Sequence, residues 1–174
     1  MQIEPSESAF AERYSRGQAQ VVWTTLVADL ETPVSVMLKL AHGQPYSFLF
    51  ESVEGGATRG RYSFIGMKPD LIWRCHGAKA EINLKARTHP DAWQPCEDSA
   101  LDALRKLVRE MRVDIPASLP PMATGLFGYM GYDMVRLMEN LPAPNPDPLG
   151  LPDSIFMRPS IMVIFDSVKD TVSV

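Results

Sequence analysis

The stretch of residues 48–66, FLFESVEGGATRGRYSFIG, constrains the fold of this chain more than any other part. An apolar run that ends at Phe50 and a second run that begins at Arg61 flank a polar segment with three glycines. Apolar and aromatic runs bounded by glycines are typical of strands, and the segment between them is too long for a two-residue hairpin turn. The sequence therefore predicts two neighbouring strands, the second of which ends at Gly66.

Three polar side chains fall at the facing ends of these two strands, namely Glu51, Ser52 and Arg61. A carboxylate, a hydroxyl and a guanidinium beside apolar strands are suited to a small zwitterion, because the acid binds an ammonium group and the guanidinium binds a carboxylate. The alternative is that Glu51 and Arg61 pair with each other at a sheet edge, where an exposed ion pair contributes little. The spacing alone leaves both interpretations open.

The remaining patterns indicate an α+β fold, with mostly antiparallel strands in one or two packed sheets and helices on the outside. Ser6 and Thr32 are suited to cap two helices, and Pro33 fits the first turn of the second one. Helices are predicted over 6–16, 33–42, 97–112 and 132–138. Further strands are predicted over 21–27, 70–75, 78–84, 125–131, 154–166 and 171–174.

Two of these strands carry a more specific prediction. Alternation over 78–84 predicts one apolar face and one solvated face, with Asn83 on the solvated face. Glycines at 125, 128 and 131 match neither a GxGxxG fingerprint nor a P-loop. We interpret them as positions where another element approaches the backbone closely.

Composition excludes several classes of protein. The chain has 174 residues, and 17 basic against 21 acidic side chains give a net charge of −4, so no nucleic-acid surface is indicated. The N-terminus lacks the pattern of a signal peptide, and no apolar run is long enough for a membrane span, so we expect a cytoplasmic protein. Cys75 and Cys96 are free to form one disulfide, but we favour two thiols in a reducing compartment.

Two motifs, ESVEGGATRGRYSFIG and GLFGYMGYDMVRLMENLP, resemble the N-terminal region of anthranilate synthase component I, in the family of chorismate-utilising enzymes. The resemblance implies that residues 1–174 form one N-terminal regulatory domain. It also implies that the chain is a fragment without the catalytic chorismate-binding domain. We therefore expect neither catalytic residues nor a metal site in this fragment, which should be inactive alone.

What the resemblance does place in this chain is the feedback site for L-tryptophan. Ser52 and Glu51 match the strand end that binds this inhibitor in the family, and Arg61 lies near a basic position of the same site. Leu49 and Phe50 would supply the apolar wall of the pocket. The implied mechanism is allosteric, because tryptophan would favour an inactive arrangement of the regulatory and catalytic domains.

The full subunit implied by the resemblance is a lyase that converts chorismate and ammonia to anthranilate and pyruvate with Mg²⁺. Its partners would be a glutamine amidotransferase subunit or domain, which supplies ammonia, and its own C-terminal catalytic domain. The fragment itself would bind no cofactor. Three alternatives stay open: the corresponding region of aminodeoxychorismate synthase component I, a non-catalytic amino-acid sensor, and a structural module without a ligand.

Overall fold

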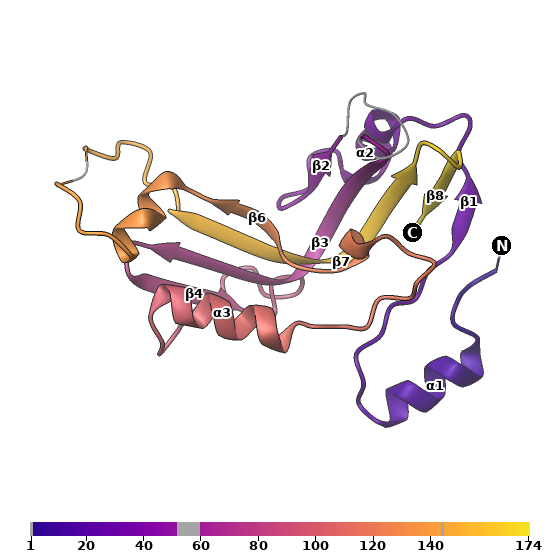
Figure 1. Ribbon diagram of the computed structural model, residues 1–174, viewed down its shortest axis with the longest axis horizontal. Coiled ribbons are helices and arrows are strands. Elements are labelled where there is room, and N and C mark those ends of the chain that lie inside the picture. The colour runs from indigo at the N-terminus through magenta and orange to yellow at the C-terminus, as the bar shows by residue number, and fades with distance from the viewer. Residues whose placement is uncertain (1, 52–59, 144) are drawn as a thin grey trace. The chain divides into compact units, whose positions relative to one another are not determined.

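The computed structural model describes residues 2–51, 60–143 and 145–174 and confirms the α+β class. Within these residues eight strands form one sheet of order β1-β8-β7-β3-β4-β5, with β2 paired to β3 and β6 paired to β7 (Figure 1). The strands are β1 Thr25–Val27, β2 Phe48–Phe50, β3 Tyr62–His76, β4 Lys79–Asn83, β5 Gln94–Pro95, β6 Phe127–Met130, β7 Ser154–Asp166 and β8 Thr171–Ser173. The α-helices are α1 Glu7–Ser15, α2 Pro33–Ala41 and α3 Ala100–Glu110, and the 3-10 helices are η1 Pro121–Ala123 and η2 Tyr132–Leu137.

The helix starts follow from side-chain caps. Ser6 accepts a hydrogen bond from the Ala9 amide at the start of α1, which confirms the predicted cap. Thr32 caps α2 in a reciprocal arrangement in which its hydroxyl accepts from the Ser35 amide, and Ser35 accepts from the Thr32 amide. The third helix begins three residues later than predicted, because Ser99 is its cap. Among the described residues, no helix is both long and apolar enough to cross a membrane.

The predicted break at Gly66 is wrong, and β3 is one strand of 15 residues that includes the separately predicted 70–75. Gly66 lies opposite Phe48 in the β2–β3 pair. A Cβ at Gly66 would overlap ring atoms of Phe48, so the glycine makes room for that ring within a continuing strand. The irregular backbone comes two residues later, at Lys68, whose φ is +52°.

The strand predicted over 21–27 is also shorter than expected, since only Thr25–Val27 forms β1. Its partner β8 is itself only three residues long. The preceding residues turn to the N-terminal segment instead, where Glu4 and Trp23 exchange two backbone hydrogen bonds of 2.8 Å. The strands predicted at 154–166 and after residue 170 are confirmed as the antiparallel pair β7 and β8.

The chain divides into two compact units, and β3 and β7 contribute to both. Unit 1 comprises residues 1–68, 113–124 and 159–174, and unit 2 comprises residues 69–112 and 125–158. In unit 1, alternate residues of β3 and β7 pack into separate clusters on the two faces of the sheet. Ile65 and Phe165 pack with residues of α2 on one face, while Phe64 and Ile164 pack against Leu119 on the other.

Unit 2 has a core of its own, centred on Trp73, which is fully buried. Leu104 and Leu107 of α3 pack into this core, and α3 runs alongside β4 (Figure 1). Val108 of the same helix is half-exposed. Cys75 lies in the same core as a free thiol, as predicted, and desolvation raises its pKa to about 11.

The solvated position predicted for Asn83 is wrong, because Asn83 is completely buried while Leu84 is 59% exposed. The alternation stops at Asn83 because β4 ends there. The Asn83 amide nitrogen donates to the carbonyls of His89 and Pro90 at 2.8 and 3.0 Å, and its oxygen accepts from the Lys85 amide at 2.8 Å. One side chain thereby joins the start of the loop that follows β4 to its middle.

The close approach predicted for the three glycines is confirmed at Gly128 and Gly131 and wrong at Gly125, where an added Cβ would meet only the Phe127 ring at 4.0 Å and the φ of +144° is what favours glycine. Gly128 lies against the backbone of β7, where an added Cβ would be 2.8 Å from the carbonyl carbon of Ile155. The amide of Gly131 donates to the Asp153 carbonyl at 2.8 Å. Two backbones therefore meet at a separation that leaves no room for a side chain.

Candidate functional site

The predicted pair of neighbouring strands exists as the antiparallel pair β2–β3 of unit 1. Phe48, Leu49 and Phe50 lie opposite Gly66, Ile65 and Phe64, respectively. Glu51 follows β2 directly and is exposed, whereas Arg61 immediately precedes β3 and is partly buried. Ser52, the remaining polar residue of the predicted site, belongs to segment 52–59, outside the described residues.

The two apolar residues of the predicted site lie on opposite faces of the sheet. Leu49 packs into the cluster that contains Ile65 and Ala41. Phe50 is 43% exposed and faces the other way, with its ring centroid 4.7 Å from that of Phe48. Because successive strand residues point to opposite faces, Leu49 and Phe50 cannot line one side of a ligand together. Their roles as ligand contacts stay predictions.

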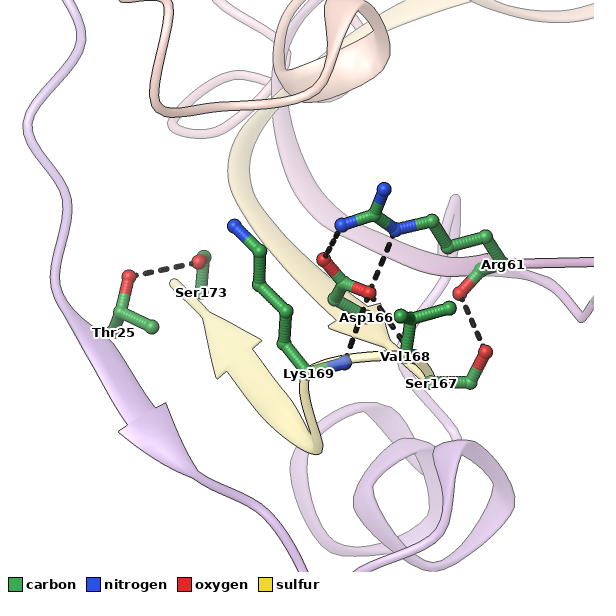
Figure 2. Close-up of polar contacts among 7 residues, drawn as sticks. All are labelled: Thr25, Arg61, Asp166, Ser167, Val168, Lys169 and Ser173. Carbon is green, nitrogen blue, oxygen red and sulfur yellow. Dashed lines mark hydrogen bonds and ion pairs between the residues drawn. The ribbon is translucent and has the colours of Figure 1, made fainter. Parts of the chain in front are cut away.

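Arg61 is bound by an aspartate that the sequence did not indicate. Its Nε donates to Oδ1 of Asp166 at 2.8 Å and its Nη2 donates to Oδ2 at 2.6 Å, in a two-pronged ion pair (Figure 2). The alternative pairing of Arg61 with Glu51 is therefore replaced by a pair 105 residues apart in sequence. The guanidinium also lies 4.9 Å from the centre of the Tyr62 ring.

Asp166 ends β7, and the four residues that follow form the turn to β8. Its Oδ1 accepts the backbone amides of Val168 and Lys169 at 3.1 and 3.3 Å. Ser167 donates both its amide and its hydroxyl to the Arg61 carbonyl, each at 3.0 Å (Figure 2). We call these five residues the Arg61–Asp166 junction. It connects the start of β3 to the β7–β8 turn through both backbone and side chain.

Electrostatics favour the charged forms of both partners. Hydrogen bonding from the Arg61 guanidinium lowers the pKa of Asp166 below its ordinary value, and this outweighs the opposing effect of burial. The same hydrogen bond raises the pKa of Arg61. Both groups are therefore ionised at neutral pH, and the junction is an ion pair rather than a neutral hydrogen bond.

We expect this ion pair to make the stability of unit 1 sensitive to acid. Because the folded-state pKa of Asp166 is lowered, its stabilisation is complete above the unfolded value of about 3.9 and is lost as pH falls through the folded value. The free energy of unfolding, measured with urea between pH 7 and pH 2.5, should therefore fall more steeply with acid for the native chain than for Asp166→Asn. If the free energies of both proteins fell in parallel, the stabilising ion pair between Arg61 and Asp166 would be contradicted.

The comparisons with known proteins show which family the chain is similar to. No protein-family model matches the chain. Anthranilate synthase component 1 of Cereibacter sphaeroides is 55% identical over 169 residues, which are 97% of this chain and 34% of that protein. The Synechocystis protein of the same name is 40% identical over 170 residues, or 96% of this chain and 32% of that protein. Over this region the chain belongs to the anthranilate synthase component 1 family.

A solved structure agrees with this assignment at the level of the fold. Anthranilate synthase component I from Streptococcus pneumoniae TIGR4 superposes with a TM-score of 0.54 at 21% identity, and covers 89% of this chain and 31% of its own. The chain spans about one third of the length of the anthranilate synthase relatives that it matches. The resemblance drawn from the two sequence motifs is thereby confirmed.

Proposed function

We propose that this chain is the tryptophan-sensing region of an anthranilate synthase component 1. The observation that carries the proposal is the 55% identity to the Cereibacter sphaeroides protein, which extends over 97% of the chain. The arrangement of the β2–β3 strand pair supports it, because Glu51 and Arg61 follow and precede these strands. An acidic and a basic group at one end of a strand pair are suited to the ammonium and carboxylate groups of an amino acid.

The whole protein would convert chorismate and ammonia to anthranilate and pyruvate as a cytoplasmic lyase, with ammonia supplied by a glutamine amidotransferase. Its catalytic domain would lie in the part of the relatives that this chain does not match. Mg²⁺ would serve that domain. The region that this chain supplies would act in regulation.

The indole of tryptophan requires an apolar surface near the two charged groups. We propose that Phe50, which is half-exposed and has its ring tilted against that of Phe48, supplies part of this surface. Tryptophan that binds here and favours an inactive state of the enzyme would lower the affinity for chorismate, and chorismate would lower the affinity for tryptophan by the same factor. Coupling of this kind is typically about 1–3 kcal/mol.

The test is a calorimetric titration of L-tryptophan into the natural protein that carries this chain, with L-phenylalanine as the control ligand. We expect saturable binding of tryptophan and inhibition of chorismate turnover at the same concentrations. Ser52→Phe, which adds bulk at the predicted inhibitor position, should raise the half-inhibitory tryptophan concentration about tenfold or more.

A matched control is Ser15→Phe, because Ser15 is an exposed serine on α1 and has no place in the proposed site. It should leave the half-inhibitory concentration unchanged. Unaltered inhibition of Ser52→Phe would remove Ser52 from the site. An intact protein that tryptophan neither binds nor inhibits would instead favour aminodeoxychorismate synthase component I.

A further inference from the structure

We propose that Asp166 is a positioning residue for the tryptophan site, and that it acts by holding the Arg61 guanidinium with one edge turned toward the ligand carboxylate. This inference rests on the proposed function. Its basis is the Arg61–Asp166 junction, in which both carboxylate oxygens of Asp166 bind the Arg61 guanidinium and Oδ1 also binds the β7–β8 turn.

The geometry of the ion pair determines which edge of the guanidinium is available. Arginine has five N–H donors in one plane, and they form two edges that can each bind a carboxylate. Asp166 occupies the edge made by Nε and Nη2. The third nitrogen of Arg61 points away from Asp166 (Figure 2). A second carboxylate would therefore approach on the outer edge, on the side remote from the Asp166 charge.

The Asp166 carboxylate is itself well fixed. Its side chain is only 12% exposed, and the amides of Val168 and Lys169 hold Oδ1 in place. Ser167 fixes the backbone of Arg61 at the same point. Both the backbone and the side chain of Arg61 are therefore set before any ligand arrives. Immobilising a long side chain on binding otherwise costs about 0.5–1.5 kcal/mol, which corresponds to about two- to tenfold in affinity.

A second ion pair in the chain has the same geometry and provides a matched control. In unit 2, Nε and Nη2 of Arg158 donate to the two carboxylate oxygens of Asp70, both at 2.8 Å. If two-pronged pairs of this kind merely stabilise the chain, loss of either one should have similar effects. If Asp166 positions Arg61 for tryptophan, only its loss should alter inhibition.

The experiment compares Asp166→Asn with Asp70→Asn in the natural protein that carries the chain. Asparagine at 166 retains an oxygen for the Val168 and Lys169 amides but replaces the other acceptor of Arg61 by a donor. We expect the half-inhibitory tryptophan concentration to rise about two- to tenfold for Asp166→Asn, measured against its own uninhibited rate. Asp70→Asn should leave it unchanged.

Two further variants keep the test decisive if Asp166→Asn folds poorly. Asp166→Glu preserves the charge and should raise the half-inhibitory concentration less than asparagine does. Arg61→Lys removes the planar guanidinium that Asp166 holds. The double variant Arg61→Lys/Asp166→Asn should therefore have the same half-inhibitory tryptophan concentration as Arg61→Lys alone. A purely structural role for Asp166 predicts additive effects in this pair instead.

The outcomes separate the two proposals. If tryptophan does not inhibit the native protein, the proposed function fails and the positioning role fails with it. If tryptophan inhibits the native protein and Asp166→Asn has the same half-inhibitory concentration, the positioning role alone is overturned. The same holds if Asp70→Asn raises the half-inhibitory concentration as much as Asp166→Asn does. A selective and non-additive effect at Asp166 would support it.

Discussion

We expect alanine at position 128 to destabilise unit 2 by about 2–4 kcal/mol. The added Cβ would be 2.8 Å from the carbonyl carbon of Ile155 and 2.9 Å from Cα of Phe156, and closer still to the Ile155 oxygen. These are backbone atoms of a paired strand, so they cannot rotate away. The strands β6 and β7 would have to separate locally and lose hydrogen bonds between them.

The matched control is Gly66→Ala, because Gly66 is also a strand glycine without a positive φ. There the added methyl group meets mainly the ring of Phe48, and a side chain can move where a backbone cannot. Gly66→Ala should therefore cost less stability than Gly128→Ala. The loss of stability of each variant is obtained from the midpoint and slope of its urea unfolding curve. Equal losses, or a loss below about 1 kcal/mol at Gly128, would contradict the close approach of β6 and β7.

Replacement of Asn83 by alanine should destabilise unit 2 by about 3 kcal/mol and loosen the loop that follows β4. The substitution would leave three backbone groups without their partner, namely the carbonyls of His89 and Pro90 and the amide of Lys85. Each buried group that loses its hydrogen bond costs about 1–3 kcal/mol unless water replaces the partner. Urea unfolding measures the loss of stability, and the rate of proteolytic cleavage within residues 85–93 measures how far the loop is loosened.

Asn83→Asp is the informative companion to this variant. Aspartate keeps an oxygen for the Lys85 amide, but at neutral pH it places a second oxygen against the two carbonyls. It should therefore be at least as destabilised as Asn83→Ala at pH 7, and should regain part of the difference in acid, where the protonated carboxyl can donate. A loop cleaved as slowly in Asn83→Ala as in the native chain would show that Asn83 does not hold it.

The parts of the fold that depend on near neighbours could be predicted from the sequence. The caps Ser6 and Thr32 act within three residues of their own position, and the structure confirms both. The strand 154–166 is predicted with its observed bounds, because a long β-branched and aromatic run needs no partner to be recognised. The strand pair around the polar segment 51–60 is likewise confirmed, since its two runs lie close together in sequence.

The errors come from partners that local patterns do not reveal. Gly66 looked like a strand end, but its role depends on the Phe48 ring across the pair. Asn83 looked like a solvated residue, but the carbonyls of the next loop fold back over it. In both cases the residue type indicates a position with a structural role, but only the tertiary contact determines what that role is.

The candidate site divides in the same way. Glu51 and Arg61 follow from the two strand ends, and the opposite directions of Leu49 and Phe50 could have been taken from the period of two in a strand. Asp166 could not, because it lies 105 residues from Arg61, at the end of β7, with no distinctive motif around it. A charged residue at the end of a strand usually faces water, so nothing local marks it as a partner of Arg61.

The pairing of β1 with β8 has a consequence for the order in which the chain is made. Thr24 and Val174 exchange two backbone hydrogen bonds of 3.0 Å, and the hydroxyls of Thr25 and Ser173 are 2.9 Å apart (Figure 2). The strand β1 is therefore synthesised roughly 150 residues, and on the order of ten seconds, before the strand that pairs with it. Until β8 has been made the β1–β8 pair cannot form, so this part of the sheet in unit 1 is completed late and by a non-local contact.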